Sequence, residues 1–319
     1  MKFLFSIALT TYNGSKFIRE QLDSIIVQTM ENFEVIVCDD NSTDDTIQIL
    51  HDYASRDSRL KIFQSQHNLG FKKNFEHALT LCKGEYIAFC DQDDIWEPNH
   101  LEILYNKIGD NDCIGANSLI VDENGISQKK TLLEYWPIHV MPKDAEQLFQ
   151  HELYSNVIQG TASLIRASLV RQALPIPEDI KYHDYWFALI AGLNGKCKYI
   201  KDVVLKYRRH SCNVTRYQTF SIINAIKDLY RFSKDRKGFY NDSINLLKNL
   251  QVQKNLHEEK RREIAEALNF HTNLLEGKDR LSTLWFYIKN YETITLSKKS
   301  IWQLFLYRCF GILIFGIKG

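Results

Sequence analysis

Short apolar runs alternate with amphipathic segments along the first ninety residues of the chain. Four runs have the length of buried strands: Phe3 to Leu9, Glu34 to Cys38, Leu60 to Phe63 and Tyr86 to Cys90. The segments between them place their apolar residues on one helical face, as Ile18, Leu22, Ile25, Ile26 and Met30 do. This rhythm predicts an α/β fold, a doubly wound and mainly parallel sheet flanked by helices.

Turn signals refine this pattern and extend it into the second half of the chain. We expect a helix from Thr43 to Tyr53, capped by Ser42 with Asp45 three residues on. Further along we expect a strand from Cys113 to Val121, a hairpin-type turn at residues 122–125, a ligand-facing turn at residues 157–163 and an apolar helix from Phe187 to Leu193. Residues 219–275 have the pattern of two or three amphipathic helices. The predicted organisation is therefore a sheet domain over residues 1–218 and a helical C-terminal region over residues 219–319.

Composition places the chain among ordinary folded proteins. With 319 residues, 25% charged and 45% apolar, it is long enough for an enzyme and is neither disordered nor collagenous. The net charge is +1, but residues 225–319 hold 17 Lys and Arg against 10 Asp and Glu. The C-terminal third is therefore the basic part of the chain.

The cysteines and the N-terminus point to the cytosol. The seven cysteines form no CxxC pair and are scattered through apolar segments, as reduced thiols are. The first apolar run stops at Thr10 without a small-residue cleavage site, so we interpret it as a strand rather than a signal peptide.

Polar residues follow three of the predicted strands, and the most acidic group is DQDD, residues 91–94. Carboxyl ends of parallel strands share one sheet edge, so this group should lie beside Thr11 and Asp39. Crowded carboxylates repel one another unless a cation lies among them, and Asp-x-Asp oxygens suit Mg²⁺ or Mn²⁺ holding a diphosphate. The alternative is an acidic turn that caps a helix beginning near Pro98. No GxGxxG follows the first strand, which argues against a nicotinamide enzyme.

Four blocks in order carry a family resemblance. Residues 11–13 (TYN), 38–44 (CDDNSTD), 68–70 (NLG) and 91–94 (DQDD) are similar to the nucleotide-sugar half of family 2 glycosyltransferases, which have the GT-A fold. The resemblance covers roughly residues 3 to 215. The sequence DQDD-Ile-Trp, together with the later His183-Asp184 pair, most resembles the bacterial rhamnosyltransferase branch.

The resemblance implies a role for each matching residue. Asp184 would be the catalytic base, and Asp93 would bind the metal, with Asp91 and His210 as further ligands. Nucleotide-sugar contacts would come from Thr11, Tyr12, Asn13, Asp39, Asp40, Asn68, Gly70, Lys72, Asp91, Gln92 and Gly160. The chemistry is compatible with these roles, because Asp39 ends a buried strand, where a carboxylate can accept the imide N–H of uracil or thymine. Thr11 and Tyr12 can contact the base by hydrogen bond and stacking.

Several of these residues also have a purely structural interpretation. Asp184 is well placed to be a helix N-cap, Asp94 could cap the helix after Pro98, and a single His210 could be structural. Asp39 and Asp40 are good turn formers, and Lys72 and Lys73 could be solvated surface lysines. Trp96 and Trp186 are interpreted as packing residues.

The chain ends in an apolar run from Ile301 to Ile317. Its 17 residues fall short of the ~20 that span a bilayer, and Arg308 at the centre of a spanning helix would cost roughly 2.5–3.5 kcal/mol. We therefore expect residues 300–317 to form an interfacial helix, with basic flanks for anionic lipid, that attaches the protein to the inner face of the plasma membrane. The alternatives are a helix docked on the sheet domain or a dimer contact.

Together these features predict an inverting, metal-dependent glycosyltransferase that uses Mg²⁺ or Mn²⁺. The expected donor is dTDP-rhamnose or another UDP or dTDP sugar, and the expected acceptor is lipid-linked, of the surface-polysaccharide or O-antigen type. We expect no nucleic-acid partner, and a homo-oligomer is compatible with the sequence. Two other classes stay open: a metal-dependent phosphotransferase or hydrolase, and a non-catalytic nucleotide-binding subunit.

Overall fold

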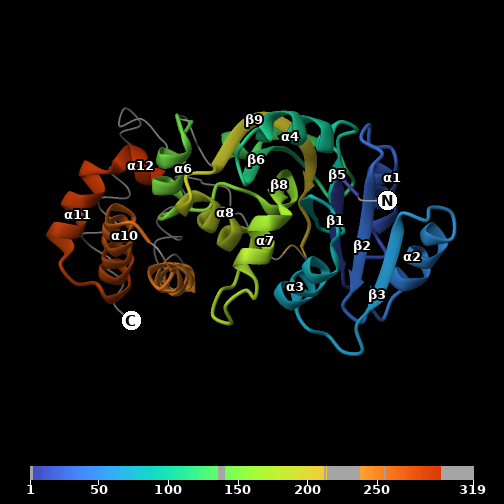
Figure 1. Ribbon diagram of the computed structural model, residues 1–319, viewed down its shortest axis with the longest axis horizontal. Helices are drawn as coiled ribbons and strands as arrows, with labels where there is room; N and C mark the ends of the chain where they lie inside the picture. The colour runs from blue at the N-terminus through green and yellow to red at the C-terminus, as the bar shows by residue number, and fades with distance from the viewer. Residues whose placement is uncertain (1–2, 136–140, 212, 214–237, 255, 296–319) are drawn as a thin grey trace. The chain divides into compact units, whose positions relative to one another are not determined.

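The computed structural model describes residues 3–135, 141–211, 213, 238–254 and 256–295 (Figure 1). These residues form two compact units. The first holds the described residues up to 135 together with Val157–Ile176 and Tyr182–Ser211. The second holds residues 141–156, Pro177–Lys181 and the described residues after 212. Segments 141–156 and 177–181 thus group with the C-terminal helices, and the expected domain boundary at 218 stays a prediction.

The first unit is built on one mixed sheet, and its N-terminal half is parallel as predicted. The elements are β1 (Phe5–Thr11), α1 (Ile18–Ile26), β2 (Phe33–Asp39), α2 (Thr46–Ala54), β3 (Leu60–Gln64), α3 (Phe71–Leu81) and β4 (Tyr86–Cys90). Strand β1 pairs in parallel with β2 and β4, and β2 pairs in parallel with β3. Every residue of β1, β2 and β4 is buried, which explains why these strands appear in the sequence as continuous apolar runs.

The second half of the sheet adds antiparallel pairs. Its elements are β5 (Ile95–Trp96), α4 (His100–Ile108), β6 (Cys113–Val121), β7 (Ser127–Thr131), α5 (Leu132–Tyr135), η1 (Gly160–Ala162), β8 (Ser163–Arg166), α7 (Ala167–Ala173), α8 (His183–Leu193) and β9 (Cys197–Arg208). The strand order is β3-β2-β1-β4-β8-β6-β9-β5, with β7 on β6. Strand β8 is antiparallel to β4 and β6, whereas the long β6–β9 ladder is parallel.

Two local predictions about helix starts are wrong. Helix α2 begins at Thr46, four residues after Ser42, and receives no side-chain cap. The Ser42 hydroxyl instead accepts from the Asn13 backbone N–H (2.9 Å) and donates to Asp39 (2.6 Å). A serine in a turn often bonds neighbouring groups in this way rather than capping a helix. Helix α4 begins after Asn99, so the buried Asp94 is not its cap.

The second unit is helical. It contains α6 (Ala145–Glu152), a helical segment over residues 238–251, α10 (Glu258–Glu276), α11 (Arg280–Lys289) and α12 (Tyr291–Thr295). An apolar cluster at its centre consists of Tyr240, Phe270, Leu274, Tyr287, Tyr291 and Ile294. None of the helices within the described ranges is both long and apolar enough to cross a membrane. The expected interfacial helix at residues 300–317 lies outside the described residues.

Candidate functional site

The carboxyl ends of β1, β2 and β4 bring the predicted polar residues to one edge of the sheet. Thr11 is in register with Asp39, and its hydroxyl donates to the Asp39 carboxylate (2.8 Å). Asp91 follows directly after β4, whose last residue Cys90 pairs with Leu9. Parallel pairing therefore assembles the site that the sequence pattern indicates.

Asp39, the last residue of β2, and Asp40, which follows it, accept hydrogen bonds from different loops. Asp39 is fully buried and accepts hydrogen bonds from Thr11, the Ser42 hydroxyl and the Ser42 backbone N–H (2.9 Å). Asp40 instead accepts from the backbone N–H groups of Leu69 (2.6 Å) and Gly70 (2.9 Å). Asp40 thus fixes the Asn68–Gly70 turn, where Gly70 adopts a φ of +83° that favours glycine.

A glutamine joins the loop after β1 to the loop after β4. The Tyr12 N–H donates to Gln92 Oε1 (2.9 Å), and Gln92 Nε2 donates to the Tyr12 carbonyl (3.0 Å). A Cβ at Gly14 would lie 2.1 Å from Gln92 Oε1, so Gly14 leaves the room for this pairing. Asn13 is tied to the loop after β2, since its side-chain oxygen accepts from the Thr43 N–H (2.8 Å). The Tyr12 ring remains 47% exposed, which suits a stacking role.

Asp184 lies in the first turn of α8 but is not its N-cap. The N-cap is Tyr182, which makes no side-chain capping bond. The Asp184 carboxylate accepts from the Gly160 N–H (3.1 Å) and from the Tyr185 N–H (2.8 Å). A Cβ at Gly160 would lie 3.0 Å from Asp184 Cβ, so Gly160 permits this close approach. The helix-capping alternative for Asp184 is therefore wrong.

The carboxylates of this edge affect one another's protonation. Burial, and then the charges of Asp93 and Asp184, raise the pKa of Asp91 to about 8. Burial, followed by the charges of Asp93 and Asp91, also raises the pKa of Asp94 well above its usual range. Asp91 and Asp94 therefore hold protons at neutral pH in the metal-free protein, and a cation bound among these carboxyl groups would favour their ionised forms.

His210 completes the acidic edge. Its Nε2 lies 2.7 Å from Asp93 Oδ2, and its ring packs on Phe17 at 4.7 Å between centroids. In the structure these two atoms are hydrogen-bonded to each other, and a carboxylate oxygen and an imidazole nitrogen are both ligand types that Mn²⁺ accepts. Within the described residues no three His, Cys, Asp or Glu side chains converge to hold an ion by themselves. A metal here would need oxygens from a bound ligand, as Mg²⁺ and Mn²⁺ sites on diphosphates do.

The remaining candidates have separate positions. Lys72 lies in the first turn of α3, and the Lys73 ammonium is 3.2 Å from Glu76. The packing interpretation of both tryptophans is confirmed, since each is 2% exposed. Trp96 stacks on His100, and Trp186 Nε1 donates to the Ala173 carbonyl (3.0 Å).

The sequence pattern gave no role to Arg208, whose side chain is buried beside Asp93 and Asp94. It also gave none to His183, whose ring stacks on Phe75 at 4.0 Å between centroids. Burial lowers the pKa of His183, so it is neutral at physiological pH. Arg208 ends β9, whose sequence CKYIKDVVLKYR holds four other charged residues, so no local signal set Arg208 apart.

We expect the metal-free protein to lose stability as the pH rises from 6.5 to 8, whereas Asp91→Asn should lose less. In this window the unfolded chain has lost the Asp91 proton and the folded chain retains it, because the folded pKa of about 8 exceeds the ordinary 3.8. The free energy of unfolding of the wild type should therefore fall relative to that of Asp91→Asn by up to about 1.4 kcal/mol per pH unit. Urea unfolding in the presence of a chelator measures it. Parallel stability curves for the two proteins would contradict the protonated state of Asp91.

The mixed sheet, with its polar edge at the carboxyl ends of β1, β2 and β4, has the architecture of GT-A glycosyltransferases. The fold is similar to that of S. aureus TarS 1–349, solved with UDP-GlcNAc (TM-score 0.63, 22% identity, 99% of this chain and 90% of that chain). It is also similar to the mannosyltransferase PcManGT from Pyrobaculum calidifontis, solved with GDP-Man and Mn²⁺ (TM-score 0.52, 16% identity, 99% of this chain and 88% of that chain).

Sequence comparison identifies the family. The profile described as glycosyl transferase family 2 matches residues 6–172. An uncharacterized glycosyltransferase of Haemophilus influenzae is 27% identical over 301 residues, 90% of each chain. A cholesterol galactosyltransferase of Borreliella burgdorferi is 26% identical over 270 residues, 79% of this chain and 73% of that protein. The chain belongs to glycosyl transferase family 2 and is a glycosyltransferase that transfers a sugar.

Proposed function

We propose that this chain is an inverting, metal-dependent glycosyltransferase that moves rhamnose, or another sugar, from a dTDP or UDP donor to a surface-polysaccharide or O-antigen acceptor. The observation that carries the proposal is the acidic edge itself. Asp184, fixed by the Gly160 N–H, lies near enough to Asp91 to raise its pKa, and Asp93 meets His210 on the same edge. A candidate base thus adjoins a candidate metal site.

The donor nucleotide would bind at the ends of β1 and β2. Asp39 uses three hydrogen bonds from the protein, and a carboxylate has about four acceptor positions, so one remains for a donor such as the imide N–H of uracil or thymine. The exposed Tyr12 ring would stack on the base. Guanine also has a ring N–H, so the choice of a pyrimidine rests on the family resemblance.

Asp93 and His210 would hold the Mg²⁺ or Mn²⁺ ion, with Asp91 beside them. A divalent cation held there would neutralise charge that develops on the leaving diphosphate. The protein's contribution is to hold these ligands and to tie the Asn68–Gly70 turn to the end of β2 through Asp40.

Asp184 would act as the base. As the acceptor oxygen bonds to the anomeric carbon and the carbon–diphosphate bond breaks, the hydroxyl proton passes to the Asp184 carboxylate. One displacement of this kind inverts the anomeric configuration. The backbone N–H groups of Gly160 and Tyr185 orient the carboxylate. Neither group is positively charged, so the carboxylate remains able to take the proton.

The comparisons support a nucleotide-sugar donor and a divalent metal. The neighbouring structures are complexes with UDP-GlcNAc in one case and with GDP-Man and Mn²⁺ in the other. The rhamnosyl part of the proposal rests on DQDD-Ile-Trp and the His183-Asp184 pair. The lipid-linked acceptor and the inner membrane face rest on the apolar run Ile301 to Ile317 and on its basic flanks.

A thermal-shift panel tests the donor. Each nucleotide sugar is added to the purified chain with Mn²⁺ or with a chelator, and a ligand present at 100 times its Kd stabilises by about 2.7 kcal/mol. We expect dTDP-rhamnose with Mn²⁺ to give the largest shift, UDP sugars a smaller one and GDP-mannose the smallest. A largest shift with GDP-mannose would overturn the pyrimidine donor, and shifts unaffected by the chelator would overturn the metal.

A further inference from the structure

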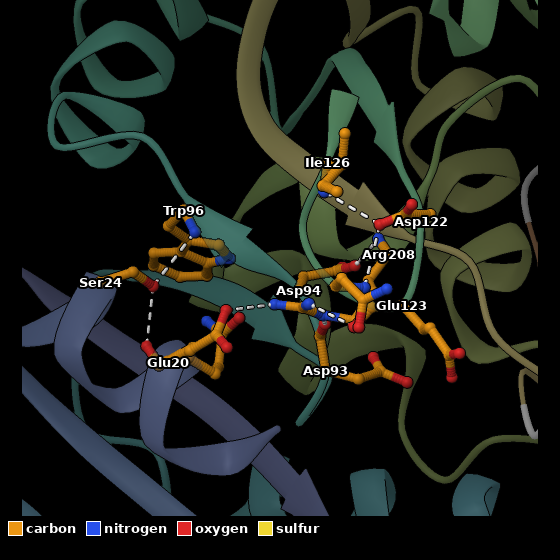
Figure 2. Close-up of polar contacts among 11 residues, drawn as sticks. Glu20, Ser24, Asp93, Asp94, Trp96, Asp122, Glu123, Ile126 and Arg208 are labelled. Carbon is orange, nitrogen blue, oxygen red and sulfur yellow. Dashed lines mark hydrogen bonds and ion pairs between the residues drawn. The ribbon is translucent and has the colours of Figure 1, made fainter. Parts of the chain in front are cut away.

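Arg208, the last residue of β9, has one of the most buried charged side chains in the described part of the chain, 1% exposed. Its guanidinium donates to the Asp93 carbonyl through Nε (2.8 Å), to the Glu123 carbonyl through Nη1 (2.9 Å) and to the Glu20 carboxylate through Nη2 (2.6 Å). Its backbone N–H donates to the Asp94 carboxylate (3.1 Å). Figure 2 shows Arg208 surrounded by these groups.

The contacts of the Arg208 guanidinium do more than neutralise its charge. A buried guanidinium is costly unless its donors are satisfied, and the Glu20 carboxylate with which it forms an ion pair is 56% exposed and therefore solvent-screened. The other two contacts are to backbone carbonyls in separate turns, the one after β4 and the one between β6 and β7. A guanidinium can bind three groups at fixed angles because its five N–H donors form a rigid planar fork, which a lysine ammonium does not offer.

The turn after β4 carries the candidate metal ligand. Arg208 holds the Asp93 backbone through its carbonyl, and His210, two residues further along the same chain, meets the Asp93 side chain at 2.7 Å. Both the backbone and the side chain of Asp93 are therefore bound by residues 208–210. A displacement of the guanidinium would move Asp93 relative to His210.

We propose that Arg208 is a positioning residue that sets the geometry of the Asp93–His210 pair and thereby the affinity of the protein for its divalent cation. The inference rests on the proposed function, which makes Asp93 and His210 metal ligands. Arg208 touches neither metal nor substrate. It acts through the Asp93 carbonyl, as outer hydrogen bonds to metal ligands do.

The test compares Arg208→Lys with a matched control, Arg166→Lys. The Arg166 guanidinium also binds two backbone carbonyls, those of Asn111 and Gly109, and the hydroxyl of Tyr86, but none of these belongs to the metal-ligand candidates. Mn²⁺ binding is followed by the electron paramagnetic resonance signal of free Mn²⁺, in the presence of the nucleoside diphosphate that most stabilises the wild type. Melting temperature is recorded for every variant.

We expect Arg208→Lys to weaken Mn²⁺ binding by about 10- to 100-fold, the size of effect seen when outer hydrogen bonds to metal ligands are lost. Arg166→Lys should leave Mn²⁺ affinity unchanged even if it lowers the melting temperature. If Arg208→Lys lowers only the melting temperature, Arg208 is a structural residue and the inference is overturned.

Two more variants decide the remaining outcomes. If Arg208→Lys does not fold, Glu20→Ala, which releases one guanidinium nitrogen at an exposed position, should weaken Mn²⁺ binding roughly two- to five-fold, the size expected for an exposed ion pair. Unchanged Mn²⁺ affinity in Glu20→Ala would then overturn the inference. Asp93→Asn separates the two proposals: if it binds Mn²⁺ like the wild type, the proposed metal site fails and the role of Arg208 fails with it.

Discussion

Asp184→Asn should lower turnover by about 10²-fold or more and leave donor affinity nearly unchanged. The amide keeps the shape of the side chain, and its oxygen can still accept from the Gly160 N–H. It cannot take a proton from the acceptor hydroxyl, and general-base catalysis is worth about 10²–10⁴-fold. Loss of kcat with intact donor binding indicates an interaction that is made only in the transition state. Donor binding by calorimetry and initial rates on the same preparation measure the two quantities.

The control for this variant is Asp144→Asn. Asp144 is a genuine helix N-cap, since its carboxylate accepts from the Gln147 N–H (2.8 Å) at the start of α6. Asparagine caps helices about as well as aspartate, so this change should affect neither stability nor turnover. Near-wild-type turnover in Asp184→Asn would move Asp184 from catalysis to structure.

Asp93→Asn should abolish the metal-dependent part of donor binding. The amide loses the charge that would hold a cation between Asp93, His210 and the diphosphate, and an uncharged oxygen is a much weaker ligand for Mg²⁺ or Mn²⁺. Calorimetry with the nucleoside diphosphate, with and without Mn²⁺, should show that the wild type gains affinity from the metal and that the variant does not.

Asp110→Asn is the matched control, because Asp110 is an exposed aspartate in the connection between α4 and β6. It should retain the full metal response. An Asp93→Asn protein that bound the nucleotide with unchanged, metal-dependent affinity would show that DQDD is an acidic turn and not a metal site.

The strands of the sheet were predictable where a strand is buried on both faces. The runs that became β1, β2 and β4 are continuous apolar segments, and the structure places their ends within two residues of the expected ones. The antiparallel pairing of β8 with β4 and β6 was not predictable, because short strands with two or three paired residues leave little periodic signal.

The positions of the candidate site residues were predictable where those residues lie at, or directly after, the end of a predicted strand. Asp39 and Asp91 follow from parallel pairing, which turns neighbouring strand ends into neighbouring loops. The Ser42 cap was wrong because local capping statistics ignore the Asn13 backbone N–H, 29 residues away in the chain, which donates to the hydroxyl oxygen. Arg208 was missed because its partners lie between 85 and 188 residues away in the chain, beyond the reach of any local pattern.

The paired hydrogen bonds between the Gln92 amide and the Tyr12 backbone bear on the engineering of donor choice. Because Gln92 binds both the N–H and the carbonyl of Tyr12, two hydrogen bonds fix the segment around residues 11–14 to the segment around residues 91–93. A chimera that imports only the first segment from a relative with another nucleotide preference would keep these two hydrogen bonds only where the imported backbone follows the same path. Grafts that exchange both segments together, and that keep a glycine at position 14, should retain the edge on which a new donor has to bind.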